Sequence, residues 1–253
     1  MLADLLHAGL GWPIATATIA VSFFSSLITA AFGIGGGAVM LAVLATLLPV
    51  PAIIPVHGLV QLGSNAGRTI LFFRHVHRAA LIPFLTGAVI GIALASSVVV
   101  QLDAGILQIT VGAFILWTVF LPIPALMQRS SAVTGAFSSF LTMFVGGTGP
   151  FVAAFVKTLE LDRVAHVGTH AAMMTAQHLL KTIAFGLLGF AFTQWAGFIA
   201  LLILAGFLGT IVGRSVLMRI DEVRFKRILN VILTLLALRL IYAGGAALLT
   251  PSG

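Results

Sequence analysis

Residues 55–69 read PVHGLVQLGSNAGRT, and residues 168–182, which lie 113 positions later, read GTHAAMMTAQHLLKT. The two stretches share a histidine, a basic residue and a threonine at matching positions. The match extends outward without a gap, because Phe24–Phe72 aligns with Phe137–Phe185 and 14 of these 49 pairs are identical. The chain therefore contains two copies of one unit. Duplicated halves are typical of transporters whose substrate binds where the halves meet.

The composition indicates a membrane protein. Of the 253 residues, 60% are hydrophobic and only 8% are charged, and the mean hydropathy is +1.19. Soluble domains are near 25% charged. Most apolar stretches are about 20 residues long, which is enough to cross a hydrocarbon layer of roughly 30 Å. These runs are continuous rather than alternating, so the predicted fold class is an all-α, polytopic membrane protein.

We expect about ten helical segments, five in each copy, with residues 1–122 forming the first membrane repeat and residues 123–253 the second. Segments 36–48, 132–145 and 149–159 are too short to cross a membrane alone, and each lies beside a glycine run. Broken helices at matching positions of two halves are the best sequence indication of a binding site. The ten segments are 10–32, 36–48, 53–73, 79–100, 105–121, 132–145, 149–159, 165–188, 194–217 and 224–248.

The loop charges predict that the second copy is inverted relative to the first. Loop Arg74–Arg78 is basic, whereas its counterpart near Leu188–Gln194 carries no charge. The bias is reversed between loop Gln101–Ala104, which is not basic, and its counterpart Arg219–Arg227, which is. Because basic loops face the cytoplasm, we expect inverted repeats with both termini on the outer side of the membrane.

Several functional classes find no support in the chain. It has no cysteine and no hydrolase, zinc-protease or phosphate-loop motif, so we expect no enzyme activity, no metal and no cofactor. The net charge of +7 fits loop cations that orient a membrane protein better than a surface for nucleic acid. All six acidic residues fall at termini, in loops or at helix ends, which disfavours a cation as the substrate.

Arg68 and Lys181 occupy matching positions in the two copies, within apolar segments. A charge at bilayer depth costs at least ~2.5–3.5 kcal/mol on insertion scales. No carboxylate is available at that depth to offset this cost, and a bound anion would compensate both cations. The alternative is that each side chain snorkels to the nearest membrane interface.

Both cations belong to polar stripes that recur at helical spacing. In lipid, such a stripe faces the protein interior or a water-filled route, or it holds packed helices together by hydrogen bonds. Because the copies are inverted, we expect His57 and Lys181 toward the outside, and His170 and Arg68 toward the cytoplasm. The predicted site residues of the stripes are His57, Gln61, Asn65 and Arg68 in the first copy, and His170, Gln177, His178 and Lys181 in the second.

Two glycine runs complete the predicted site, and each opens a short helix. Helix N-termini present free N–H groups and a partial positive charge to an anion. In the second run, Thr148 is expected at the N-cap and Pro150 in the first turn. Glycines also allow membrane helices to pack closely, so the runs are informative mainly because they match. The residues concerned are Gly35, Gly36, Gly37, Thr148 and Gly149.

The chain resembles the TauE/SafE family of sulfite and organosulfonate exporters. The resemblance rests on the glycine run Gly33–Gly37, its degenerate copy Gly146–Pro150, the stretch Pro55–Asn65 and the plan of two repeats. It implies a multi-pass transporter, an exporter, of a small sulfur-containing anion such as sulfite, thiosulfate or an organosulfonate. It also implies a place in the bacterial inner membrane.

From the residues alone, two functions remain open. The first is a secondary transporter for a small anion that works by alternating access around a cationic site in mid-membrane. The second is an anion-selective channel for small oxyanions, which would share the cationic route. In either case the partners are the anion and the lipid bilayer. His57, His170 and His178 could titrate near neutral pH and couple proton movement to transport.

Overall fold

The computed structural model describes residues 2–32, 35–98, 103–216 and 222–249. Within these ranges the chain is helical apart from short turns, and no strand is present. Four helical stretches are long and apolar enough to span a membrane. They are Trp12–Phe32, Arg78–Val98, Phe192–Ser215 and Arg227–Leu249. The prediction of an all-α, polytopic membrane protein is therefore confirmed.

All ten predicted segments are present, and their observed ends differ from the predicted ones by at most about three residues. The first copy comprises α1 (Leu2–His7), α2 (Trp12–Phe32), α3 (Gly36–Leu47), α4 (Val50–Leu71), the 3₁₀ turns η1 (Phe73–His75) and η2 (Arg78–Ala80), α5 (Leu81–Val98) and α6 (Ala104–Phe120). The second comprises α7 (Ala125–Gln128), α8 (Ser131–Val145), α9 (Gly149–Lys157), α10 (Arg163–Leu187), the 3₁₀ turn η3 (Phe192–Trp195), α11 (Ala196–Val216) and α12 (Glu222–Leu249).

Some predicted helices and helix ends differ from the structure, and others lie outside the described residues. The short helices α1 and α7 were not predicted. Helix α4 begins at Val50 rather than at residue 53, because Pro49 and Pro51 suit the cap and first turn of a helix. Residues 33–34, the predicted helix ends at 99–100 and 217, and residues 219–221 of the basic loop lie outside the described residues.

Helices α3 and α9 are half-helices that start inside the bundle. With 12 and nine residues, they extend only about 18 Å and about 14 Å. Glycine allows each break, since Gly35 and Gly146 have φ angles of 104° and 78°. At the start of α3, a Cβ on Gly36 would overlap the carbonyl oxygen of Ser25 in α2. Only glycine therefore lets α3 begin against the middle of α2.

Helices α4 and α10 form the centre of the bundle and run antiparallel. Near one end of the pair, Gly58 lies against the side chain of Lys181, and near the other end Phe72 packs on Gly168. Between them, the hydroxyl oxygens of Thr69 and Thr175 lie 3.0 Å apart. His57 thus shares one end of the pair with Lys181, and Arg68 shares the other with His170, which is the relative placement expected for inverted copies.

The two copies are interlocked through glycine contacts. Gly91 of α5 packs on the backbone of Ala136 in α8, and Gly209 of α11 packs on the backbone of Phe23 in α2. Ala136 lies 113 positions after Phe23, and Gly209 lies 118 positions after Gly91, so the two contacts are equivalent. Each copy therefore supports a helix of the other. The division of the chain at residue 122 remains a prediction.

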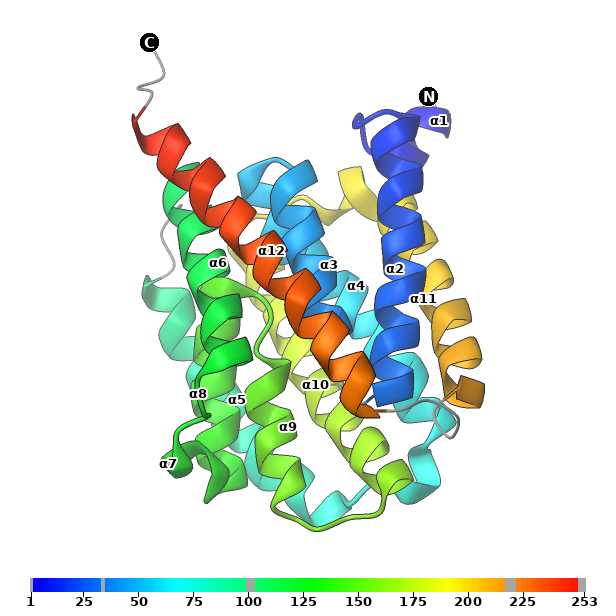
Figure 1. Ribbon diagram of the computed structural model, residues 1–253, viewed down its shortest axis with the longest axis vertical. Coiled ribbons are helices and arrows are strands. Elements are labelled where there is room, and N and C mark those ends of the chain that lie inside the picture. The colour runs from blue at the N-terminus through cyan, green and yellow to red at the C-terminus, as the bar shows by residue number, and fades with distance from the viewer. Residues whose placement is uncertain (1, 33–34, 99–102, 217–221, 250–253) are drawn as a thin grey trace.

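Different terminal segments and inter-helix loops lie at the two ends of the bundle. Helix α1 and the C-terminal end of α12 both lie at the top of Figure 1, on opposite sides, whereas η1, α7 and the link between α9 and α10 lie at the bottom. The hydroxyl of Ser131 in α8 donates to the carbonyl of Ala80 at that lower end, over 2.6 Å. The basic loop around η1 is therefore opposite α1. That the lower end faces the cytoplasm remains a prediction.

Candidate functional site

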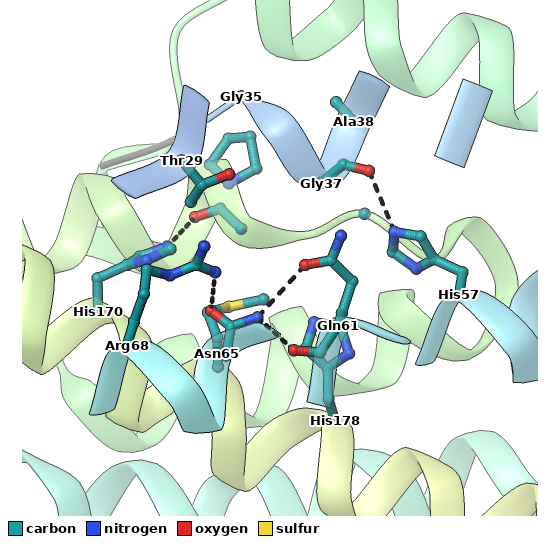
Figure 2. Close-up of a pocket in the computed structure, with 14 residues that line it drawn as sticks. Thr29, Gly35, Gly37, Ala38, His57, Gln61, Asn65, Arg68, His170 and His178 are labelled. Atoms are coloured by element: carbon teal, nitrogen blue, oxygen red, sulfur yellow. Dashed lines mark hydrogen bonds between the residues drawn. The ribbon is translucent and has the colours of Figure 1, made fainter. Parts of the chain in front are cut away.

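The N-terminal ends of α3 and α9 meet at a cavity between α4 and α10 (Figure 2). Its volume of about 40 Å³ is enough for roughly three waters or one small oxyanion. Nine of the 13 predicted site residues line it: Gly35, Gly37, His57, Gln61, Asn65, Arg68, Gly149, His170 and His178. Both copies of the repeat therefore contribute to one cavity.

Two histidines hold the half-helix starts in matching ways. His57 Nε2 lies 3.1 Å from the carbonyl oxygen of Gly37, and His170 Nε2 lies 3.2 Å from that of Gly149. Because a carbonyl oxygen only accepts, Nε2 is the donor in both bonds. Figure 2 shows His57 and His170 on opposite sides of the cavity, with Arg68 beside His170. Each histidine thus ties a central helix to the start of a half-helix.

Arg68 presents a buried positive charge to the cavity. Its side chain is 1% exposed, so it does not snorkel to an interface. Nη2 donates to Asn65 Oδ1 over 2.8 Å, and Nη1 donates to Ser64 Oγ over 3.3 Å. Nε has no partner among the described residues. The guanidinium therefore keeps both its charge and part of its donor capacity.

Lys181 is also buried, at 0% exposure, but it does not line the cavity. Its Nζ donates to Thr142 Oγ1 over 3.2 Å and to the carbonyl of Gly146 over 3.3 Å. Thr142 in turn donates to the carbonyl of Gly146 over 2.8 Å. The second cation thus lies behind the cavity, against the break between α8 and α9.

Three other predicted residues also lie behind the cavity wall. Thr148 occupies the N-cap position of α9, as expected, but its side chain does not cap the helix. Instead Thr148 Oγ1 accepts from Gln177 Nε2 over 2.8 Å, while Gln177 Oε1 accepts from Ser138 Oγ over 2.9 Å. Gly36 packs against α2. Gln177 and Thr148 therefore hold the break between α8 and α9 in place.

Five lining residues were not predicted as site residues. Thr29 is identical to its repeat partner Thr142, and Gly147 and Pro150 belong to the second glycine run, so the sequence carried a signal for these three. Ala38 and Met174 carried none, because small or apolar side chains are common throughout membrane helices. The five residues are Thr29, Ala38, Gly147, Pro150 and Met174.

The cavity lining is rich in donors and contains no acidic residue. Asp103 and Asp162 cap α6 and α10 instead, each accepting from backbone N–H groups. The described residues contain no group of three or more side chains that could hold a metal ion. An arginine, amide side chains and the free N–H groups of helix starts suit an acceptor-rich anion.

A larger cavity of about 740 Å³ lies toward the end of the bundle that carries α1. It is lined by the start of α4, the C-terminal ends of α8 and α10, and Trp195 of η3. Ile54 belongs to this lining, and its side chain lies with that of Leu41 against Gly146, at the break between α8 and α9.

At the opposite end of the bundle, hydrogen bonds join the two copies. Arg163 Nη2 donates to the carbonyl of Ala31 over 3.2 Å, and the backbone N–H of His77 donates to Thr169 Oγ1 over 2.9 Å. The larger cavity therefore lies at one end of the bundle, and these contacts lie at the other.

Comparison with known proteins identifies one family. The model of the sulfite exporter TauE/SafE family matches residues 18–240, which include every residue that lines the cavity. No curated protein and no solved structure matched the chain. Since the family match covers most of the chain and agrees with its resemblance in sequence, the protein belongs to the TauE/SafE sulfite exporter family.

Proposed function

We propose that the protein is a secondary transporter that exports a small sulfur-containing oxyanion, such as sulfite, thiosulfate or an organosulfonate. The observation that carries this proposal is the Arg68 guanidinium, which is buried, lines a cavity between two half-helix starts and has no acidic residue beside it. A buried charge without a counter-ion is costly, and a bound anion would supply that counter-ion. The family match supports a sulfur-containing anion.

In the proposed complex, the anion binds between Arg68 and the start of α3. The first N–H groups of a helix have no acceptor inside the helix, so that of Gly37, which lines the cavity, is available to an anion oxygen. The half-helix starts add a partial positive charge that complements the guanidinium. Lys181 contributes its charge from behind the cavity, without contact in this conformation.

Transport proceeds by alternating access in this proposal. The conformation described here has its larger cavity at the end that carries α1, and Arg163 bonds to Ala31 toward the other end, which is the closed end in this proposal. By the positive-inside rule, the closed end faces the cytoplasm of a bacterial inner membrane. Inverted repeats can exchange their conformations, which would open the cytoplasmic end and close the outer one.

We propose a proton as the coupling ion. The rings of His57 and His178 lie 6.0 Å apart, and Nδ1 of each is buried without a partner. Protonation there would turn an acceptor into a donor for the anion, so an anion and a proton could move together. If this is correct, anion flux in vesicles follows an imposed pH gradient, and it loses that dependence in His178→Gln.

Counterflow in proteoliposomes tests the proposed function. Vesicles loaded with unlabelled thiosulfate should accumulate labelled thiosulfate transiently, with a rate that saturates. A channel would show neither counterflow nor saturation at modest concentrations, and either absence would replace the transporter with that alternative. A protein that moves none of sulfite, thiosulfate and methanesulfonate contradicts the proposal entirely.

A further inference from the structure

The two walls of the central cavity differ at matching positions of the repeat. With the offset of 113 positions, Gly37 corresponds to Pro150 and Gln61 corresponds to Met174. All four residues line the cavity. In each pair, the first copy supplies a hydrogen-bond donor and the second copy supplies none. The cavity is therefore built by two related copies but lacks donors along part of its second-copy wall.

The first-copy wall is equipped for anion oxygens. A Cβ on Gly37 would lie 3.5 Å from Gln61 Nε2, so the backbone of the half-helix start and the side-chain amide are neighbours. Asn65 and Arg68, one and two turns further along α4 from Gln61, line the same wall. Free N–H groups, an amide and a guanidinium thus converge from one copy.

The second-copy wall is apolar at the corresponding place. Pro150 has no backbone N–H, so the first turn of α9 loses a donor where α3 has one. Met174 is 4% exposed and packs with Val152 and Phe155 in an apolar cluster. Its methyl carbon lies 3.8 Å from where a Cβ on Gly149 would be, at the start of α9. The Met174 methyl group therefore lies at the start of this half-helix, next to His170 Nε2, which is 3.7 Å from the same point.

We propose that the wall formed by Met174 and Pro150 selects anions in which one corner around sulfur is not an oxygen. Sulfite has a lone pair at that corner, thiosulfate has a second sulfur and a sulfonate has a carbon. Three oxygens then face the donors of the first copy, and the fourth corner faces the polarisable thioether, which has no hydrogen-bond donor to offer. Sulfate and phosphate place an oxygen at every corner and are rejected. This inference rests on the proposed function and specifies its substrate class.

The expected preference for thiosulfate over sulfate follows from the fourth oxygen of sulfate, which would face Met174 and find no hydrogen-bond donor. An anion that buries one charged oxygen without a hydrogen-bond donor loses affinity on the order of 10- to 100-fold. The wild-type protein should therefore bind thiosulfate at least about tenfold more tightly than sulfate.

Competition binding to the purified protein tests the inference, with labelled thiosulfate as the probe and sulfate and methanesulfonate as competitors. Met174→Gln introduces at this position the glutamine that the first copy has at position 61. We expect this variant to bind thiosulfate and to let sulfate compete at a concentration about tenfold lower or less. Met174→Leu keeps the wall apolar and should exclude sulfate as the wild type does. Pro150→Ala restores the missing N–H and should favour sulfate in the same direction as Met174→Gln.

The outcomes of this experiment distinguish failure of the selectivity inference from failure of the proposed function. If the wild type binds thiosulfate and sulfate equally, or if Met174→Gln and Pro150→Ala bind thiosulfate yet still exclude sulfate, the selectivity inference is wrong and the proposed function stands. If Met174→Gln does not fold, Pro150→Ala decides by itself. If the wild type binds neither thiosulfate nor methanesulfonate, the proposed function is wrong.

Discussion

The ammonium nitrogen of Lys181 lies 3.2 Å from the hydroxyl oxygen of Thr142, within hydrogen-bond distance. In the first copy the matching residues are Arg68 and Thr29, which both line the cavity. Among the described residues these two share no hydrogen bond, and the hydroxyl of Thr29 donates instead to the carbonyl of Ser25. The two copies thus hold equivalent cations in different ways, as alternating access by exchange of conformations requires.

Thr142→Val and Thr29→Val should shift the conformational equilibrium in opposite directions. Valine at position 142 removes a partner of Lys181 in the conformation described, whereas valine at position 29 removes a partner that Arg68 would gain in the opposite one. A hydrogen bond to a charged group contributes about 1.5–3 kcal/mol, so each shift should be on the order of tenfold or more.

The native chain has no cysteine, so a single cysteine at position 144 can report this shift. Phe144 lines the larger cavity, and labelling of Phe144→Cys should slow in the Thr142→Val background and quicken in the Thr29→Val background. Equal changes in both backgrounds would refute an exchange of roles between the copies.

Gly36→Ala should destabilise the protein, whereas Gly37→Ala should not. A Cβ on Gly36 overlaps the backbone of Ser25, and such overpacking costs about 1–3 kcal/mol. A Cβ on Gly37 meets only Gln61, at an ordinary distance of 3.5 Å, so this variant should fold but bind the anion more weakly in a crowded cavity. Thermal unfolding in detergent compares the two variants. Equal stability for both would mean that α3 does not start against α2 as described.

Single cysteines at His75 and Asp103 should be labelled from opposite sides of the membrane. His75 belongs to η1, at the end opposite α1, and Asp103 caps α6 near the end that carries α1. Thr193 of η3 provides a second reporter at the latter end that has no capping role. An impermeant reagent applied to intact cells should react at positions 103 and 193 and not at position 75. Labelling of all three from one side would contradict the inverted arrangement.

The fold was predictable because its determinants are local and repeated. Long apolar runs define the membrane helices, and the glycine runs define where α3 and α9 start. Helices α1 and α7 were not predicted because six and four residues carry too little periodicity. The interlocked packing of the copies could not be predicted, since contacts such as that of Gly209 with Phe23 depend on tertiary geometry.

The site was predictable to the extent that polar residues on one face of a membrane helix have to meet. This argument located His57, His170 and Arg68 at the cavity, but it could not tell which way a long side chain turns. Lys181 follows the same stripe, yet its Nζ reaches Thr142 rather than the cavity. Met174 has no polar atom to mark it, so only its position opposite the start of α9 shows that it matters.

The affinity of thiosulfate for Arg68→Gln, measured by calorimetric titration of the purified protein, tests the central claim most directly. Glutamine keeps a donor at the cavity but removes the charge that a bound anion would neutralise. We expect affinity to fall by about 100-fold in Arg68→Gln, and by less in Arg68→Lys, which keeps the charge and loses the planar fork of donors. An Arg68→Gln protein that folds and binds thiosulfate as tightly as the wild type would show that the buried guanidinium does not hold the anion.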